Sequence, residues 1–389
     1  MQATQPFLVY RDRIGVPSEI EFLRRQYIGF TRLHPVWTGR TMLPDALRFG
    51  DHLLRLGGDG PRGPIDRALF RHLWRVAPRL IRHGPIYPSQ HGAATAGGSN
   101  SPGQGGIAGL APVLHAQFAR GGALALPLVQ ALGMRMVVTL HGGDVSKQKN
   151  WHGTVLARRW PAMLRETRRF VCVSAAVAEI AAYHGVPSGK LIVLPIGVEI
   201  PARPPIRRPT AHLFVGRFVE KKGIAVLAEA IRQLRAQGDQ TQVVCVGDGP
   251  LRPVLETLAR DTAGITLTGW LPPDAVRARM TEAIALVVPS IIAGDGDAEG
   301  LPSVIPEAMA QACPVIGSDQ GGIAEAIWRD QTGLLVPPGD PGALADAMHR
   351  ISHDTVLRYS LGAAGFTEAA TRLNARIQSE KLETLLLSV

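Results

Sequence analysis

The chain has 389 residues, of which 46% are hydrophobic and 19% are charged. This length exceeds what one ordinary hydrophobic core organises, and the composition supplies enough apolar material for two globular domains. No run of about eighteen apolar residues occurs, which excludes a segment that spans a bilayer.

The three cysteines, Cys172, Cys245 and Cys313, lie in apolar runs such as VVCVG and show no metal-ligand spacing. We therefore expect buried, reduced thiols. The N-terminal segment MQATQPFLVYRDR lacks the long apolar region and the cleavage site of a signal peptide, so we expect a cytoplasmic protein.

The net charge of +10 is unevenly distributed along the chain. Residues 1–200 carry 24 Lys and Arg against 11 Asp and Glu, whereas residues 201–389 carry 18 against 21. An anionic partner attracted by this charge would therefore meet the first half.

In the first half, short apolar runs predict strands at 7–11, 35–40, 113–118, 136–141, 169–174 and 191–196. Helical patterns separate them, so we expect a parallel-sheet domain over residues 1–200. Gly15, followed by VPSEIEFLRRQ, reads first as a turn from strand to helix, and its amides could approach phosphate groups.

Residues 66–83 form a predicted basic helix with two open interpretations. One face holds five arginines, and the opposite face is apolar and includes Trp74; the arginines are Arg67, Arg71, Arg75, Arg79 and Arg82. The helix would lie on an anionic membrane, or it would be a domain helix packed on the sheet. The Gly-rich stretch 83–109 that follows is expected to be a mobile loop.

The segment TLHGGDV predicts a strand that ends at His141, a candidate donor of a hydrogen bond to a hydroxyl group in a cleft. A purely structural His141 is the alternative. Asp144 is a candidate helix cap. The proline-rich segment 201–210 is the expected interdomain linker.

In the second half, strands are predicted at 212–218, 242–249, 265–271, 285–290, 314–322 and 332–340. Alternation with helices indicates a second Rossmann-like, doubly wound parallel sheet over 211–365. A C-terminal helix at 366–389 is expected to pack back on the first domain. Two such domains would face each other across a cleft at the carboxyl ends of their strands.

The segment VGRFVEKKG ends a strand at Gly216 and then presents Arg217 and Lys222. Two cations at that position can neutralise a diphosphate leaving group. Of the two adjacent lysines, Lys221 is expected to face solvent more than Lys222. The alternative is an ordinary basic loop on the surface.

Glu299 and Glu307 stand eight positions apart around Gly300 and a helix predicted to begin near Pro302 or Ser303. Their carboxylates suit the binding of sugar and ribose hydroxyls, and Gly300 would let backbone approach a ligand. The alternative is that Glu307 only favours the helix N-terminus and that Glu299 is a solvated loop charge.

Taken in order, the segments TLHGGDV, VGRFVEKKG, VVCVGDGPL, ITLTGWL, EGLPSVIPEAMAQACPVIGSDQGGIAEAI and TGLLVPPGD resemble glycosyltransferase family 4. The members of this family are retaining enzymes of the GT-B fold. DGDAEGLP is similar to the branch that builds bacterial exopolysaccharides and capsules. Two departures stand out: Ile196 precedes Gly197 where many relatives have Asn-Gly, and Gly15 stands without a second glycine.

The resemblance implies a donor site without a metal. Arg217 and Lys222 would hold the donor diphosphate, Glu299 the transferred sugar, Glu307 the ribose and His141 a sugar hydroxyl. The remaining contacts would come from the backbone of Gly300, Leu301, Pro302 and Ser303, and from the backbone near Trp270 and Leu271 for the nucleobase. DGD at 295–297 would not be a metal site.

The expected function is therefore retaining transfer from a UDP- or GDP-sugar to a lipid-linked oligosaccharide at the inner face of the cell membrane, with no cofactor. A GT-B phosphorylase or sugar-phosphate synthase with a soluble acceptor is the alternative.

A basic module that binds nucleic acid or membrane without catalysis would explain the charge but not the Glu299 segment. No nucleic-acid partner is expected, because aromatic RNA motifs and zinc spacings are missing. The GxGxxG fingerprint of a dinucleotide oxidoreductase is also missing.

Overall fold

The computed structural model describes residues 4–16, 19–43, 45, 52–55, 87–88 and 110–389. The predicted basic helix at 66–83, with its arginines and Trp74, lies outside the described residues. The same holds for nearly all of the predicted loop at 83–109.

The first half is built on an eight-stranded sheet in the order β10-β9-β8-β7-β1-β3-β5-β6. Every pair is parallel except β5 with β6 at the edge. The strands are β1 (Gln5–Tyr10), β3 (Leu33–Gly39), β5 (His52–Arg55), β6 (Tyr87–Pro88), β7 (Val113–Gln117), β8 (Arg135–Leu140), β9 (Thr167–Cys172) and β10 (Leu191–Val193). Two further short strands pair with each other, β2 (Arg13–Ile14) and β4 (Thr41–Met42).

The second half is built on a wholly parallel sheet in the order β13-β12-β11-β14-β15-β16. Its strands are β11 (Ala211–Val215), β12 (Gln242–Val246), β13 (Ile265–Gly269), β14 (Ala283–Val288), β15 (Val315–Ser318) and β16 (Leu334–Val336). The strand order reverses between β11 and β14, and in doubly wound sheets ligands bind beyond the carboxyl ends of the strands at that point. The expected α/β fold with two Rossmann-like sheets is confirmed.

Helices cover both sheets, and several begin at polar caps. Thr154 accepts a hydrogen bond from the amide of Ala157, and Asp340 accepts one from the amide of Ala343. The helices of the first half are α1 (Ile20–Arg25), α3 (Ala119–Leu132), α4 (Gly143–Ser146), α5 (Val155–Glu166) and α6 (Ala175–Tyr183). Those of the second half are α7 (Ile224–Ala236), α8 (Arg252–Asp261), α9 (Pro273–Glu282), α10 (Val304–Ala310), α11 (Gly321–Ala326) and α12 (Pro341–His353).

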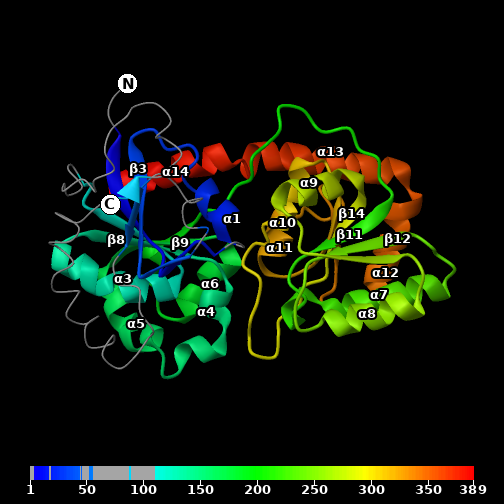
Figure 1. Ribbon diagram of the computed structural model, residues 1–389, viewed down its shortest axis with the longest axis horizontal. Helices are drawn as coiled ribbons and strands as arrows, with labels where there is room; N and C mark the ends of the chain where they lie inside the picture. Colours follow the sequence, from blue (N-terminus) through cyan, green and yellow to red (C-terminus); the bar gives the residue numbers. More distant parts are fainter. Residues whose placement is uncertain (1–3, 17–18, 44, 46–51, 56–86, 89–109) are drawn as a thin grey trace.

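The last two helices run from the second sheet back to the first (Figure 1). Helix α13 (Thr355–Arg372) packs on α10, and α14 (Ala375–Ser388) contacts α1 and β7. The buried carboxylate of Glu383 on α14 accepts hydrogen bonds from three backbone amides of the first half, at residues 31–33. Residues 201–210, which precede β11, form no helix or strand. In the described part of the chain, no helix is both long and apolar enough to cross a membrane.

Candidate functional site

The two halves touch through glycines at the carboxyl ends of their strands. A β-carbon added at Gly300 would lie 2.3 Å from the carbonyl oxygen of His141, and one at Gly142 would lie 2.5 Å from the amide nitrogen of Gly300. Side chains at these positions would push the halves apart. The close neighbour of Gly300 is thus the backbone of the first half, whereas the sequence suggested a ligand.

Lys222 and Glu299 form an ion pair at this edge of the second sheet. Lys222 ends a short 3-10 helix that follows β11, and its Nζ lies 3.1 Å from Oε1 of Glu299. The next residue, Gly223, has a φ of 68°, and a β-carbon there would lie 1.8 Å from the carbonyl oxygen of Pro289. Only glycine fits this turn, so the backbone fixes where Lys222 points.

The Glu299 carboxylate is kept ionised by lysines. Its side chain is only 11% exposed, and burial alone would raise its pKa. Lys222 and Lys221 more than offset this effect and hold the pKa of Glu299 below its usual value. At neutral pH the group is therefore a carboxylate, which can accept hydrogen bonds from hydroxyls.

The expectation that Lys221 faces solvent more than Lys222 is wrong, because the Lys222 side chain is 15% exposed. The Lys221 side chain is 12% exposed, and its Nζ lies 3.1 Å from Oδ1 of Asp297 and 3.5 Å from Oε1 of Glu299. Lys147 of the first half reaches the other oxygen of Asp297 at 2.7 Å. The 295–299 loop folds back on the tight turn after β11, so both neighbouring lysines meet carboxylates. A chain of alternating charges consequently joins the two halves.

Arg217 is exposed, whereas the nearby Lys221 and Lys222 are mostly covered. It follows Gly216 directly after β11, and no ion pair of its side chain occurs within the described ranges. A diphosphate at the edge of the sheet would therefore find the Arg217 guanidinium available. Trp270 and Leu271 follow β13 at the same edge; Trp270 is exposed, whereas Leu271 packs against the core of the second half.

His141 follows β8 and is held by a buried hydrogen-bond chain. Its Nε2 lies 2.9 Å from Oε1 of Gln117, and Nε2 of Gln117 donates to the hydroxyl of Tyr27 at 2.7 Å. An amide oxygen only accepts, so this network assigns the proton of His141 to Nε2. The sequence suggested donation to a hydroxyl, but this tautomer presents Nδ1 as an acceptor.

The electrostatic surroundings keep His141 neutral. Burial lowers its pKa to about 3, and the nearby positive charge of Arg11 acts in the same direction. Asp144 fixes the backbone there, because its carboxylate accepts from the amides of His141 at 2.9 Å and Ala119 at 2.8 Å. It therefore caps the first residue of α3 rather than its own helix. Burial raises the pKa of Asp144 to about 6.

Glu307 contacts the first half through a residue that sequence reasoning missed. Nη1 of Arg25, the last residue of α1, donates to Oε1 of Glu307 at 2.6 Å, and the Arg25 side chain is 6% exposed. The two positions are 282 residues apart, so no local pattern joins them. Gln117, Asp297 and Lys147 were missed for the same reason.

Two other predictions concerned backbone groups, namely the amides before α10 and the turn at Gly15. Helix α10 begins at Val304, and Pro302 has no N–H to donate, so the predicted run of amides is interrupted. Gly15 follows β2 with a φ of 93°, as expected for a turn. Within the described residues, however, no hydrogen bond or ion pair joins Gly15 to Lys222, Glu299 or Glu307.

Two family models match the chain in separate parts. The model described as Glycosyltransferase Family 4 matches residues 111–200, and the model described as Glycosyl transferases group 1 matches residues 209–354. Both matched ranges contribute strands whose carboxyl ends carry the residues described above.

Curated relatives include glycosyltransferases named for bacterial polysaccharides. The amylovoran biosynthesis glycosyltransferase AmsK of Erwinia amylovora is 29% identical over 71% of this chain and 70% of that protein. WcaL of Salmonella typhimurium, named for colanic acid biosynthesis, is 32% identical over 64% of each chain. The match thus spans about two thirds of these relatives.

Solved structures share the whole architecture. HepE from Anabaena, in complex with UDP and glucose, has a TM-score of 0.75 and 15% identity over 100% of both chains. The sucrose-phosphate synthase of Thermosynechococcus elongatus has a TM-score of 0.70 and 22% identity over 99% of this chain and 98% of that chain. At these identities the likeness concerns the fold.

Proposed function

Because this chain belongs to glycosyltransferase family 4 and has the GT-B fold, we propose that it transfers a sugar from a nucleoside-diphosphate sugar to an acceptor in polysaccharide synthesis. The observation that carries the proposal is the Lys222–Glu299 pair, 3.1 Å apart beside the exposed Arg217. This arrangement supports the proposal, because a sugar diphosphate needs cations for its phosphates and a hydrogen-bond acceptor for its hydroxyls.

The donor diphosphate would lie against Arg217 and Lys222, whose charges stabilise the negative charge that grows as the phosphate leaves. Glu299 would accept hydrogen bonds from the transferred sugar, and Nδ1 of His141 would accept one from another of its hydroxyls. Glu307 would use Oε2 for the ribose, since Arg25 occupies Oε1. UDP and UDP-glucose in the HepE structures make a UDP-sugar the first donor to try.

The proposed chemistry retains the configuration at the anomeric carbon. The bond from that carbon to the phosphate oxygen breaks while its bond to the acceptor oxygen forms on the same face. The acceptor proton passes to the departing phosphate oxygen, and the nucleoside diphosphate leaves. Neither Glu299 nor Glu307 acts as a nucleophile here, and charge neutralisation by Arg217 and Lys222 would make a metal unnecessary.

For the acceptor we propose a lipid-linked oligosaccharide at the cytoplasmic face of the membrane. The support is the names of the relatives, which concern amylovoran and colanic acid, and the positive charge of the first half. Lipid-linked intermediates are presented on anionic membranes, which attract such a charge.

The test is transfer of radiolabelled sugar from UDP-glucose, UDP-galactose and GDP-mannose. Bacterial membrane lipid extract, inorganic phosphate and a sugar phosphate serve as separate acceptors. The proposal predicts a labelled product that partitions into organic solvent, formed only with the lipid extract. Product formed only with phosphate would instead indicate a phosphorylase, and product formed only with a sugar phosphate would indicate a synthase.

A further inference from the structure

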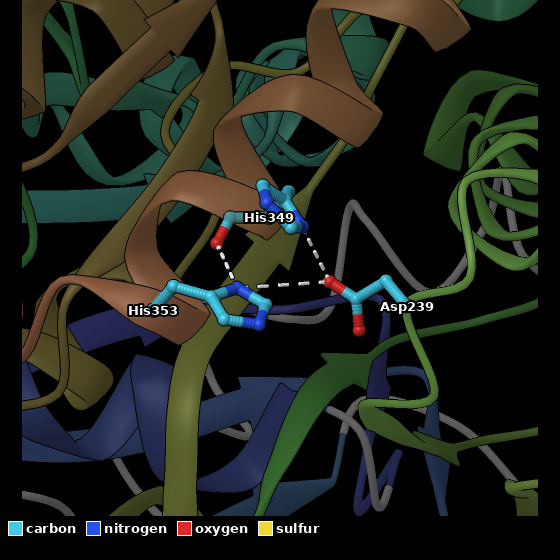
Figure 2. A group of neighbouring side chains, drawn as sticks. All are labelled: Asp239, His349 and His353. Carbon is cyan, nitrogen blue, oxygen red and sulfur yellow. Dashed lines mark hydrogen bonds and ion pairs between the residues drawn. The ribbon is translucent and has the colours of Figure 1, made fainter.

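A second group of chemically active side chains lies at the opposite edge of the second sheet. His349 and His353 stand one helical turn apart near the end of α12, and Asp239 lies in the turn between α7 and β12 (Figure 2). The turn precedes β12, whereas the proposed donor site lies at the carboxyl ends of the strands. The group is therefore separate from the candidate donor site.

The three side chains lie close together. Nδ1 of His349 lies 2.8 Å from Oδ2 of Asp239, and Nδ1 of His353 lies 3.9 Å from the same oxygen. One ligand atom from each residue lies within 4.8 Å of the others. A tetrahedral zinc ion bonded at about 2.0–2.2 Å holds its ligand atoms about 3.3–3.6 Å apart, which falls between the two measured distances. Nδ1 of His353 also donates to the backbone oxygen of His349 at 2.9 Å. Metal binding would therefore require both imidazoles to release their present hydrogen bonds and turn a nitrogen lone pair toward the ion.

The carboxylate is oriented in advance by the surrounding backbone. Oδ1 of Asp239 accepts from the amide of Thr241 at 2.8 Å and from its hydroxyl at 2.5 Å, which leaves Oδ2 facing the imidazoles. Burial opposes ionisation of Asp239, but these hydrogen bonds and the histidines lower its pKa to about 2. Hydrogen bonds of this kind to a ligand carboxylate are the usual support of a metal site.

The exposed fractions of these three side chains would also let water reach a bound ion. Asp239 is 2% exposed, whereas His349 and His353 are 49% and 59% exposed. A buried carboxylate flanked by two accessible imidazoles gives three protein ligands from one side and leaves the other side for water. Imidazole nitrogen and carboxylate oxygen are both common zinc ligands.

We propose that Asp239, His349 and His353 bind one zinc ion, with water completing its coordination. The ion would join the end of α12 to the turn between α7 and β12, and so stabilise the second half of the chain. This inference is independent of the proposed transfer reaction, because none of the three residues belongs to the donor site.

The experiment is calorimetric titration of zinc chloride into the full chain, prepared without a histidine tag and freed of metal with a chelator. The expected result is one equivalent bound and a rise of several degrees in the thermal midpoint, with magnesium chloride producing neither. The H349Q/H353Q double variant should weaken zinc binding at least tenfold and lose the thermal shift. Both substituted side chains are exposed, so the variant should keep its circular dichroism spectrum.

The matched control is H152Q, which replaces an exposed histidine of the first half and should bind zinc like the original chain. Because imidazole protonation competes with the metal, affinity should fall when the pH is lowered from about 7.5 to about 5.5. The absence of saturable zinc binding would overturn the proposal. So would binding that the double variant leaves unchanged, since the ion would then lie elsewhere.

Discussion

Arg25 and Glu307 are joined by a hydrogen-bonded ion pair of 2.6 Å, although one ends the first helix of the chain and the other lies on α10. The contact ties the first half of the molecule to the helix that follows Glu299. It also occupies one oxygen of Glu307 and thereby orients the other. Under the proposed function, this pair would link the contact between the two halves to the orientation of Glu307 toward the ribose.

Replacing Arg25 by Met should lower the free energy of unfolding by about 1–3 kcal/mol, because a partly buried carboxylate loses its partner. E307Q should cost less, since its amide oxygen still accepts from Arg25. The R25M/E307Q double variant should lose less than the two single losses combined, as coupled residues do. Urea unfolding followed by tryptophan fluorescence measures all three. Strictly additive losses would mean that Arg25 interacts no more strongly with the Glu307 carboxylate than with an amide at that position.

Replacing Lys222 by Ala should lower kcat by roughly 10²–10³-fold, because it removes a cation from the position of the leaving diphosphate. The fold should persist, as shown by an unchanged circular dichroism spectrum. K381A, an exposed lysine on α14, is the matched control and should keep the original rate. A K222A variant as active as the original chain would remove the phosphate role from this residue.

The buried, neutral imidazole of His141 should make the stability of the chain depend on pH. Its folded pKa of about 3 lies below the unfolded value of about 6.5. The unfolded chain therefore binds more protons between these values, and the contribution of His141 to stability is complete above pH 6.5 and is lost as the pH falls. H141N should destabilise the chain at pH 7.5, and the difference from the original chain should shrink toward pH 4.5. A constant difference between their unfolding free energies across that range would contradict the buried neutral imidazole.

Gly300 offers a test of how closely the halves approach. G300A places a β-carbon against the carbonyl oxygen of His141, and such overpacking typically costs about 1–3 kcal/mol. G189A is the control, because a β-carbon there has no atom within 4 Å. Its effect on the urea midpoint should be much smaller. Equal effects of the two substitutions would show that the close approach at Gly300 is not maintained in solution.

The sheets were predictable from the sequence because their strands are short apolar runs between helical patterns. FLVY in β1 and ALVV in β14 are buried along their whole length, as central parallel strands require. The antiparallel β5–β6 edge was not predicted, since a strand of two residues carries no periodicity. The local sequence pattern thus predicted the central strands but not the strand pairing at the edge of the first sheet.

The site was only partly predictable, because its remaining contacts join distant positions. Motif reasoning selected Lys222 and Glu299, and the structure brings their side chains together. It could not tell that both adjacent lysines are mostly covered and meet carboxylates, since that depends on how the 295–299 loop folds back. The partner of Glu307 was equally hidden, because the path from α1 to α10 passes through both domains and no sequence spacing encodes it.

The proposed donor site at Lys222 and Glu299 is tested most directly by equilibrium binding of UDP, GDP and ADP. Isothermal titration of the original chain and of K222A, with K381A alongside, measures affinity without knowledge of the acceptor. We predict that at least one nucleotide binds with one equivalent, that K222A weakens it at least tenfold and that K381A does not. Binding of none of the three nucleotides, or equal binding by K222A, would contradict the proposed donor site.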